Sequence, residues 1–374
     1  MSWEEIELKE VSKYRTEKIN TTEIETNYIS TENMLPEKGG IIDSSYPPTS
    51  KTVASFKTND VLVSNIRPYF KKIWFADFDG GCSNDVIVFK TDEKNLIPKF
   101  LYYQLSKDEF FDFMMSGANG TKMPRGNRKA IPTFKLLLPP LQTQKRISDI
   151  LSAYDGLIEN NLKRIRLLGQ AAQNIYKEWF VNLRFPGHEN TPINEETGLP
   201  EGWEENALGE FTEIKKGKNI TKSTIIDGNV PVVAGGLKPA YYHNTSNTSN
   251  PVITVSASGA NAGYVNMYLE DIWASDCSYI DSKLSDSVFF IHNLLSNQQE
   301  LIFGMQRGAA QPHVYPKDLK RAEFVIPDKG LIQKFEEQVS AQYDMKRVLL
   351  NQNQKLKAAR DILLPRLMNR TIEV

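Results

Sequence analysis

The stretch LQTQKRISDILSAYDGLIENNLKRIRLLGQAAQNIYKEWF, residues 141–180, decides the fold of this chain. Steps of four and three residues, taken alternately along it, reach a chiefly apolar stripe. The positions in the stripe are Ile147, Leu151, Tyr154, Ile158, Asn161, Ile165, Leu168, Ala172, Ile175 and Trp179. A strict seven-residue period is typical of a coiled-coil seam, so the pattern predicts a long helix packed lengthwise against another long helix.

A second stretch with a looser repeat lies near the C-terminus, at residues 331–364. One face of this predicted helix carries Phe335, Val339, Leu349, Leu356 and Leu363, and Gln342, Lys346 and Asn353 interrupt it. In the first stripe, Asn161 is expected to form a polar layer that fixes the register, with Asn353 facing it. Forty helical residues span roughly 60 Å, so the two helices are predicted to act as a spacer.

The composition is that of an ordinary globular protein. Of the 374 residues, 40% are hydrophobic and 24% are charged, and the formal net charge is −1. This length predicts two or three domains. The near-neutral charge argues against a polybasic binder but not against local basic clusters. The sequence shows neither an apolar run long enough to span a membrane nor a secretory leader, so we expect a cytoplasmic protein. Cys82 and Cys277 are far apart and are expected to be small buried residues.

An internal repeat divides the chain into two heads and two helices. Trp3-Glu4-Glu5, with Leu8 and Glu10, returns as Trp203-Glu204-Glu205, with Leu208 and Glu210. The ends of the heads match as well, since Gly120, Pro124 and KLLLP up to Pro139 correspond to Gly308, Pro312 and EFVIP up to Pro327. The sequences between these markers differ. The repeat therefore predicts a duplicated framework with divergent middle regions.

Each head is predicted to be an α+β domain. Strands are expected at residues 61–63, 73–75 and 85–89 in the first head and at 230–233, 251–255 and 272–274 in the second. One helix is expected in each, at residues 98–113 and 288–303. The expected domains are residues 1–140 (first head), 141–180 (first long helix), 181–327 (second head) and 328–374 (second long helix and C-terminal tail).

The sequence gives little support for catalysis by this chain. It contains no glycine-rich phosphate-binding motif and no [DN]PP[YF] motif of the kind amino-methyltransferases use. The nearest nuclease-like pattern is Asp85 followed by Asp92-Glu93-Lys94, which more simply predicts an exposed turn after a strand. The four histidines are scattered without metal-ligand spacing. We therefore predict no catalytic residue and no metal site.

Basic residues among small and amide residues are the stronger signal. Lys and Arg side chains bind phosphates, while Arg, Asn, Gln and Ser side chains read base edges. In the first head the candidates are Arg67, Lys71, Lys72, Asn119, Lys122, Arg125, Asn127, Arg128 and Lys129. In the second head they are Lys215, Lys216, Lys218, Lys222, Ser258, Asn261, Arg307, Gln311 and His313. A single basic loop is more often a solvated surface, but clusters at corresponding places in two heads favour DNA binding.

Four junction segments give the chain a resemblance to the specificity subunits of type I restriction-modification enzymes. They are LPPLQTQKRI at residues 138–147, WFVNLRFPG at 179–187, GLPEGWEENALGE at 198–210 and LLPRLMNR at 363–370. The segments match the family's junctions in order and spacing, and the resemblance covers the whole chain. The second copy departs from the pattern, because Ile332 stands where Gln144 stands in the first copy.

The resemblance implies two target-recognition domains joined by two long antiparallel helices that form a coiled-coil spacer, with an internal pseudo-two-fold repeat. Each domain would read one half of a bipartite double-stranded DNA target, and the helices would fix the gap and dock two methyltransferase subunits. S-adenosylmethionine would come with the methyltransferase, which modifies adenine at N6. ATP and Mg²⁺ would come with the restriction and translocase subunits. The chain itself would be non-catalytic and would bind no cofactor.

Two alternatives stay open at this point, because heptads alone do not identify a partner. The first is a coiled-coil scaffold or adaptor without DNA specificity, which would lack the steep salt dependence of duplex binding. The second is a self-sufficient nuclease or methyltransferase, whose activity would depend on residues such as Asp85 or Lys94.

Overall fold

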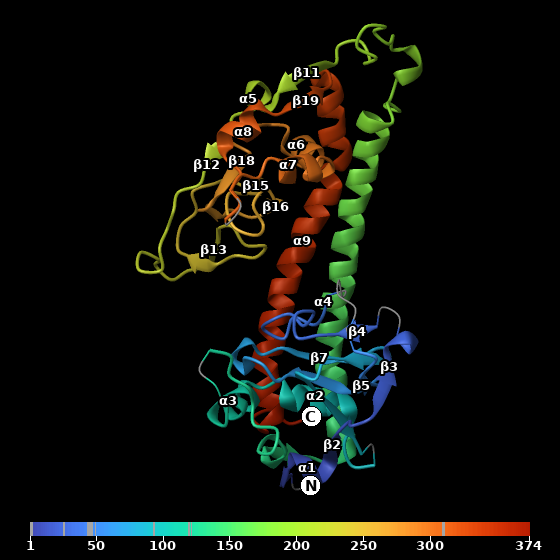
Figure 1. Ribbon diagram of the computed structural model, residues 1–374, viewed down its shortest axis with the longest axis vertical. Coiled ribbons are helices and arrows are strands. Elements are labelled where there is room, and N and C mark those ends of the chain that lie inside the picture. The colour runs from blue at the N-terminus through green and yellow to red at the C-terminus, as the bar shows by residue number, and fades with distance from the viewer. Residues whose placement is uncertain are drawn as a thin grey trace. The chain divides into compact units, whose positions relative to one another are not determined.

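The structure is a computed structural model that describes residues 3–24, 27–42, 48, 50–92, 94–118, 120, 122–308 and 311–374. The chain divides into two compact units (Figure 1). Unit 1 comprises Met1–Ile158 and Gln354–Val374, and unit 2 comprises Glu159–Asn353. Each unit thus contains a segment of both long helices. The domain boundaries expected from the sequence, which follow the helix ends, stay a prediction.

Where the structure describes unit 1, it combines short strands with short helices. Its strands are β1 (Glu4–Glu7), β2 (Ser12–Tyr14), β3 (Lys18–Asn20), β4 (Tyr28–Ile29), β5 (Thr52–Phe56), β6 (Val61–Ser64), β7 (Ile73–Phe75), β8 (Gly80–Cys82), β9 (Val86–Thr91) and β10 (Lys135–Leu138). Its helices are α1 (Leu8–Val11), α2 (Pro98–Leu105) and α3 (Asp108–Ser116). The first half of α4 (Leu141–Tyr176) and the last residues of α9 (Lys329–Met368) complete it.

The main core of unit 1 lies on a four-stranded sheet with the strand order β2-β9-β6-β7. The runs VLVS and VIVF of the two central strands are buried, as expected for strands covered on both faces. On this sheet, Phe100 and Leu101 of α2 belong to the same apolar cluster as Val61 and Ile87. A second sheet, β3-β5-β8-β4, shares a smaller apolar cluster with the first sheet, in which Phe56 of β5 joins Leu62 of β6 and Val88 of β9.

Unit 2 is built from a similar set of elements. Its strands are β11 (Glu204–Ala207), β12 (Lys215–Lys216), β13 (Val230–Val233), β14 (Tyr241–His243), β15 (Val252–Ser256), β16 (Val265–Tyr268), β17 (Trp273–Ala274), β18 (Cys277–Asp281) and β19 (Glu323–Ile326). Its helices are α5 (Leu208–Phe211), α6 (Val288–Asn297), α7 (Gln299–Gly304) and α8 (Pro316–Arg321). The second half of α4 and most of α9 belong to it.

The two units repeat the same framework, as the sequence markers predicted. The sheet β12-β18-β15-β16 of unit 2 has the order and pairing of β2-β9-β6-β7 in unit 1. The antiparallel pair β11-β19 likewise repeats β1-β10. The remaining sheets differ, with four strands in unit 1 and three (β14-β13-β17) in unit 2. The internal repeat is therefore confirmed for the framework, while the divergent middle regions form different sheets.

Both helices predicted inside the heads are shorter in the structure than expected. In unit 1 the expected helix 98–113 is broken at Lys107, whose backbone is extended, directly after Ser106, whose hydroxyl donates to the Tyr102 carbonyl (2.7 Å). A new helix then starts at Asp108. In unit 2 the expected helix 288–303 ends at Asn297, and α7 follows after Gln298. Neither break is marked by proline or glycine, so the periodic pattern passed over both.

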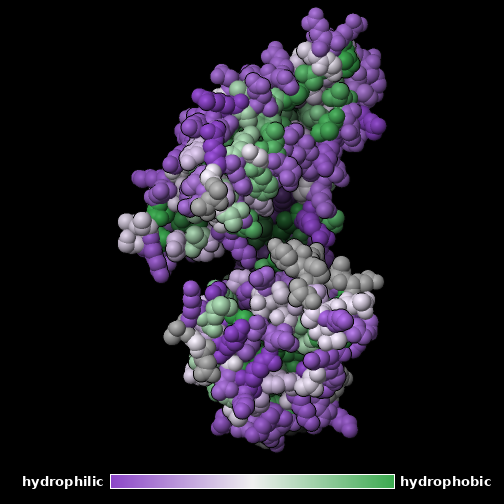
Figure 2. Space-filling model, viewed as in Figure 1, coloured by the Kyte–Doolittle hydropathy of each residue, from purple (hydrophilic) through white to green (hydrophobic). Residues whose placement is uncertain are grey.

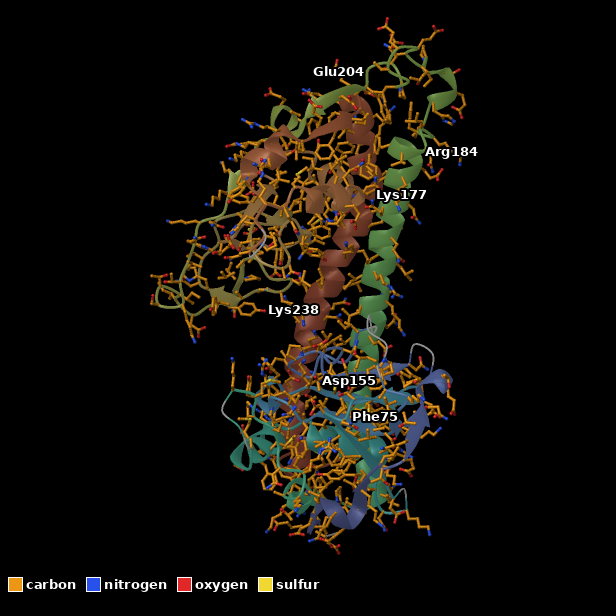
Figure 3. The ribbon with its side chains drawn as sticks, in the orientation of Figure 1. Phe75, Asp155, Lys177, Arg184, Glu204 and Lys238 are labelled. Carbon is orange, nitrogen blue, oxygen red and sulfur yellow. The ribbon has the colours of Figure 1, made fainter. Side chains whose placement is uncertain are left out.

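Within each unit, α4 and α9 lie side by side (Figure 1). In unit 1, Asp155 of α4 accepts hydrogen bonds from the Tyr103 hydroxyl (2.6 Å) and from Nη1 of Arg360 in α9 (2.8 Å; Asp155 is labelled in Figure 3). In unit 2, the predicted polar layer is present, since Asn161 Nδ2 donates to Asn353 Oδ1 at 3.0 Å. Both side chains are buried, and this bond pairs an Asn161 N–H group with the Asn353 carbonyl oxygen.

The predicted seam positions lie on the covered side of each helix. Buried positions are Ile147, Leu151, Ile158, Asn161, Phe335, Val339 and Leu349, and half-buried ones are Tyr154, Ile165, Leu168, Leu356 and Leu363. The seam does not face a helix alone, because Ile147 joins the main core of unit 1 and Phe335 that of unit 2. In α9 the stripe also uses Tyr343, which is buried where the sequence pattern placed Gln342. The helix extends past the expected end to Met368, with Pro365 inside it.

The two units close their helix junctions in different ways. In unit 1, the Gln144 side chain of α4 accepts from the Ile97 amide at the start of α2 (2.9 Å) and donates to the Pro139 carbonyl (2.9 Å). In unit 2, where Ile332 replaces the glutamine, Glu336 accepts from the Phe290 amide in the first turn of α6 (2.6 Å). Burial raises the pKa of Glu336 to about 7. The second junction thus keeps the helix-capping contact one turn later in the sequence.

The structure also bears on the membrane question and the cysteines. Among the described residues, no helix has both the length and the apolar character needed to cross a bilayer. Cys82 and Cys277 are both buried, and burial raises the pKa of each thiol to about 12. Each therefore packs as a small apolar residue.

The Asn161 and Asn353 pair gives a direct test of the helix packing in unit 2. Replacing Asn161 alone with leucine leaves the buried Asn353 amide without this partner, which we expect to lower the free energy of unfolding by about 1–3 kcal/mol. The double substitution Asn161→Leu/Asn353→Leu should regain most of that loss, because two apolar groups then face each other. Chemical denaturation of the complex with its partner subunits measures both. A double variant as unstable as the single one would contradict the pairing.

Candidate nucleic-acid interface

Two predicted basic stretches of unit 1 meet at one place in the structure. Residues 64–72 follow β6, and residues 122–129 follow α3; we call them the paired loops of unit 1. The Arg67 amide donates to the Pro124 carbonyl (2.8 Å), and the Gly126 amide donates to the Asn65 carbonyl (3.1 Å). An isolated bridge joins Ile66 to Arg125. Residues far apart in sequence are thus joined by backbone hydrogen bonds.

The lysines of the first loop have different environments. Lys71 Nζ lies 3.0 Å from Asp108, and this hydrogen bond raises its pKa. Lys72 donates from Nζ to the Thr31 carbonyl (2.6 Å), and burial lowers its pKa. The exposed rings of Tyr69 and Phe70 directly precede the two lysines in the sequence, and their centroids are 4.6 Å apart. Lys72 is therefore mainly a structural residue. The Tyr69 and Phe70 rings are accessible, although the sequence did not predict them as DNA-binding residues.

The second loop of unit 1 carries most of the accessible charge. Arg125 forms an ion pair with Asp85 (3.2 Å) while its side chain stays about half exposed. Arg128 donates to the Asn84 carbonyl, and Asn127 Oδ1 accepts from the Lys129 amide (3.0 Å). Lys122 and Lys129 are exposed. The predicted candidate Asn119 lies outside the described residues.

The paired loops of unit 2 are residues 256–264, after β15, and residues 306–308 with 311–314, after α7. The Gly259 amide donates to the Pro312 carbonyl (3.0 Å), and the Val314 amide donates to the Ala257 carbonyl (3.0 Å). An isolated bridge joins Ser258 to His313. These contacts are the same as those of unit 1, although the side chains are unlike.

Among the DNA-binding residues predicted in unit 2, some have hydrogen-bond partners within the unit and others are exposed. Arg307 and His313 exchange backbone hydrogen bonds (2.9 and 2.8 Å), and the Arg307 guanidinium lies 2.8 Å from Asp318. Ser258 donates to Asp276, and Asn261 donates to the Gly235 carbonyl (3.4 Å). Gln311 is exposed.

The first loop of each pair corresponds residue by residue, with no gap. Each closes with one backbone bond of 3.0 Å, from Ser64 to Lys72 and from Ser256 to Tyr264. The backbone is left-handed at Arg67 (φ 49°) and Lys71 (φ 51°) in unit 1, and the equivalent residues in unit 2 are Gly259 and Gly263 (φ 80° and 87°). Two positive φ angles at the same places mean that both units hold one loop shape with different side chains.

Four further lysines of unit 2 lie apart from its paired loops in sequence. All four are exposed: Lys215 and Lys216 form the edge strand β12, and Lys218 and Lys222 follow it. Gly217 between them has no room for a side chain, because a Cβ atom would lie 2.2 Å from the Ser275 carbonyl oxygen. This close approach fixes the start of the segment, so the lysines extend from a defined backbone.

The described residues do not support the nuclease pattern. Asp85 is paired with Arg125, and Lys94 donates its amide to Asp92 in a turn (3.3 Å), while Glu93 lies outside the described residues. Among the side chains that the structure describes, no group of three His, Cys, Asp or Glu residues could hold a metal ion.

Comparison with known proteins assigns the family. The model of the type I restriction modification DNA specificity domain matches residues 1–168 and 200–356. These matches cover most of the sequence, so the chain belongs to this family. The two matched segments coincide with the two repeats of the framework.

Individual relatives are distant but extend over most of the chain. The type I restriction enzyme MjaIX specificity subunit of Methanocaldococcus jannaschii is 24% identical, and the match covers 74% of this chain and 70% of that protein. The HindI specificity subunit of Haemophilus influenzae is 23% identical, with 84% and 87% covered. The S subunit of the M. genitalium type I system has a TM-score of 0.58 at 16% identity, over 98% and 96% of the two chains. That structural likeness supports the fold.

The shape of the unit 2 loops depends on Gly235. A Cβ atom at Gly235 would lie 2.6 Å from the Ser258 carbonyl oxygen, whereas one at the neighbouring Gly236 would have only an ordinary contact of 3.5 Å. Gly235→Ala should therefore displace residues 256–264 and increase hydrogen exchange of their amides, while Gly236→Ala leaves exchange unchanged. Equal exchange in the two variants would contradict this role of Gly235.

Proposed function

We propose that this chain is the DNA-specificity subunit of a type I restriction-modification complex, and that it contributes recognition without catalysis. The observation that carries the proposal is the pair of loop scaffolds. Both units hold their loops with the same backbone bonds, yet unit 1 presents Arg67, Tyr69 and Arg125 where unit 2 presents Gly259, Asn261 and His313. One scaffold with two sets of side chains suits the recognition of two different half-sites.

We also propose that α4 and α9 act as an antiparallel coiled-coil spacer that sets the gap between the half-sites. The heptad stripe, its covered positions and the Asn161–Asn353 layer support this role. A spacer works only if it is stiff, and paired helices are stiffer than a loop linker.

The same helices offer a surface for protein partners. In unit 2, the side chains of Leu162, Leu167, Val348 and Leu350 are exposed, with exposures from 39% to 59%. The surface of each unit is otherwise largely hydrophilic in the view of Figure 2. Exposed apolar groups on a helix favour protein docking. We propose that two methyltransferase subunits bind the helices, and that restriction and translocase subunits join through them.

The cofactors of the proposed complex belong to the partners. S-adenosylmethionine would bind the methyltransferase, and ATP and Mg²⁺ the restriction subunit. Adenine methylation in a duplex requires the base to be flipped out, so the methyltransferase must be held over a chosen base. A subunit that addresses chromosomal DNA in this way would act in the cytoplasm. The scaffold alternative is less well supported, because it gives no reason for duplicated loops with different basic residues.

The proposed function can be tested by co-expressing the chain with a methyltransferase encoded beside it. Single-molecule sequencing of host DNA should then show N6-methyladenine in a split motif with a fixed gap. Omission of this chain provides the control and should abolish the methylation. An assembled complex that binds the methyl donor but leaves host DNA unmethylated would contradict the proposal and favour the scaffold alternative.

The spacer role makes a separate prediction for the gap. Residues 163–169 of α4 and 345–351 of α9 lie on either side of the same part of the seam and form one heptad of each helix. Deleting both shortens the helix pair by about 10 Å, so the gap should shrink by about three base pairs or methylation should be lost. Methylation of the wild-type motif by the deletion variant would overturn the spacer role.

A further inference from the structure

We propose that position 125 of unit 1 and the equivalent position 313 of unit 2 determine base specificity, and that Arg125 recognises a guanine. The inference rests on the proposed function, since it concerns how the paired loops read DNA. Asp85 is the positioning residue for the Arg125 side chain. In both units, main-chain hydrogen bonds join the two loops of the pair.

The equivalence of the two positions follows from the bonds around them. Arg125 bridges to Ile66, and His313 bridges to Ser258, which occupies the equivalent place in the unit 2 loop. Directly beside each bridge lies an aspartate whose carbonyl accepts from the loop. Asn65 donates its amide to Asp85 (2.8 Å) as Ala257 does to Asp276 (3.1 Å).

The Asp85 carboxylate fixes the direction of the Arg125 guanidinium. Arg125 Nε lies 3.2 Å from Asp85 Oδ1, and Nη2 lies 3.5 Å from Oδ2. This fork occupies one edge of the guanidinium and leaves the N–H groups of Nη1 and one N–H of Nη2 for a ligand. Two parallel N–H donors match the O6 and N7 acceptors of guanine in the major groove.

The exposure of the pair favours recognition over a structural role. The Arg125 and Asp85 side chains are 52% and 35% exposed, and exposed ion pairs contribute little to stability. A phosphate contact would not require such orientation, because phosphate can be approached by a mobile cation. Lys122 and Lys129, which are exposed and form no ion pair with any described residue, suit that second task.

Unit 2 presents different chemistry at the same position. Here Asp276 accepts from the Ser258 hydroxyl, and His313 packs parallel to Tyr315 with ring centroids 5.8 Å apart. Imidazole offers one donor and one acceptor, or two donors when protonated, instead of an arginine fork. The two units therefore recognise different groups at equivalent bases of their half-sites.

The test uses the full chain in complex with its methyltransferase and a library of duplexes that vary each base of the target. Wild type should prefer guanine at one position by on the order of ten- to a hundredfold. Arg125→Ala and Arg125→Lys should both remove that preference while the other positions keep theirs. His313→Ala should relax one position in the other half-site.

The positioning role of Asp85 is tested by a double-mutant comparison. Asp85→Ala should weaken the preference at the same base as Arg125→Ala, and the double variant should be no less specific than Arg125→Ala alone. Lys135→Ala is the matched control, because it removes another exposed ion pair of unit 1, with Glu5 at 2.6 Å, away from the paired loops. This control should keep every preference.

Two outcomes would overturn the inference. In the first, Arg125→Ala weakens binding equally for all sequences and lowers the salt slope by about one, which is the behaviour of a phosphate contact. In the second, Arg125→Ala retains the guanine preference. A wild-type complex without any bipartite preference would instead refute the proposed function, so the two failures are distinguishable.

Discussion

The packing of α4 against α9 is the contact on which both units depend. Neither unit has a complete core without segments from two distant parts of the sequence, since Leu151 of α4 and Leu367 of α9 share the main core of unit 1. In unit 2, Phe180, just beyond the end of α4, contacts Phe335 of α9, with ring centroids 5.3 Å apart. Each long helix is therefore part of two cores. A change in the helix pairing would disturb the framework that positions the loops.

The duplication separates what must stay constant from what can vary. Backbone hydrogen bonds hold the paired loops in both units, and backbone bonds place few demands on side chains. Arg67 and Gly259 adopt left-handed backbone at the same place, although only glycine does so without steric cost. Arg67 thus adopts a backbone conformation that is unfavourable for a residue with a side chain. This is consistent with a functional role for the arginine side chain.

Much of the framework could be predicted from the sequence, because local patterns of apolar residues determine its helices and strands. The heptad stripe from Ile147 and the apolar runs of β6 and β9 each correspond to an element of the structure. The breaks at Lys107 and Gln298 escaped prediction because they depend on local side-chain and backbone hydrogen bonds rather than on proline or glycine.

The candidate site was predictable only as a set of loops. The meeting of residues 64–72 with 122–129 depends on backbone bonds between distant segments, and no periodic pattern reports them. Lys71, Lys72 and Arg125 differ in their hydrogen-bond partners, which depend on the carboxylate or carbonyl that lies nearby. A sequence shows that a residue is basic, but its availability is a property of the fold.

Ion pairs within the loops help to explain how a chain with a near-neutral net charge could bind DNA selectively. Lys71, Arg125 and Arg307 each lie beside a carboxylate, so much of the positive charge of the loops is already compensated. In the proposed recognition role, phosphates must compete with those carboxylates, which would weaken binding to arbitrary DNA. A base that offers correctly placed acceptors can use the oriented donors without displacing the carboxylate. In the proposed recognition role, paired cations would therefore raise the ratio of specific to non-specific affinity, and this ratio decides whether a site is found among many competing sequences.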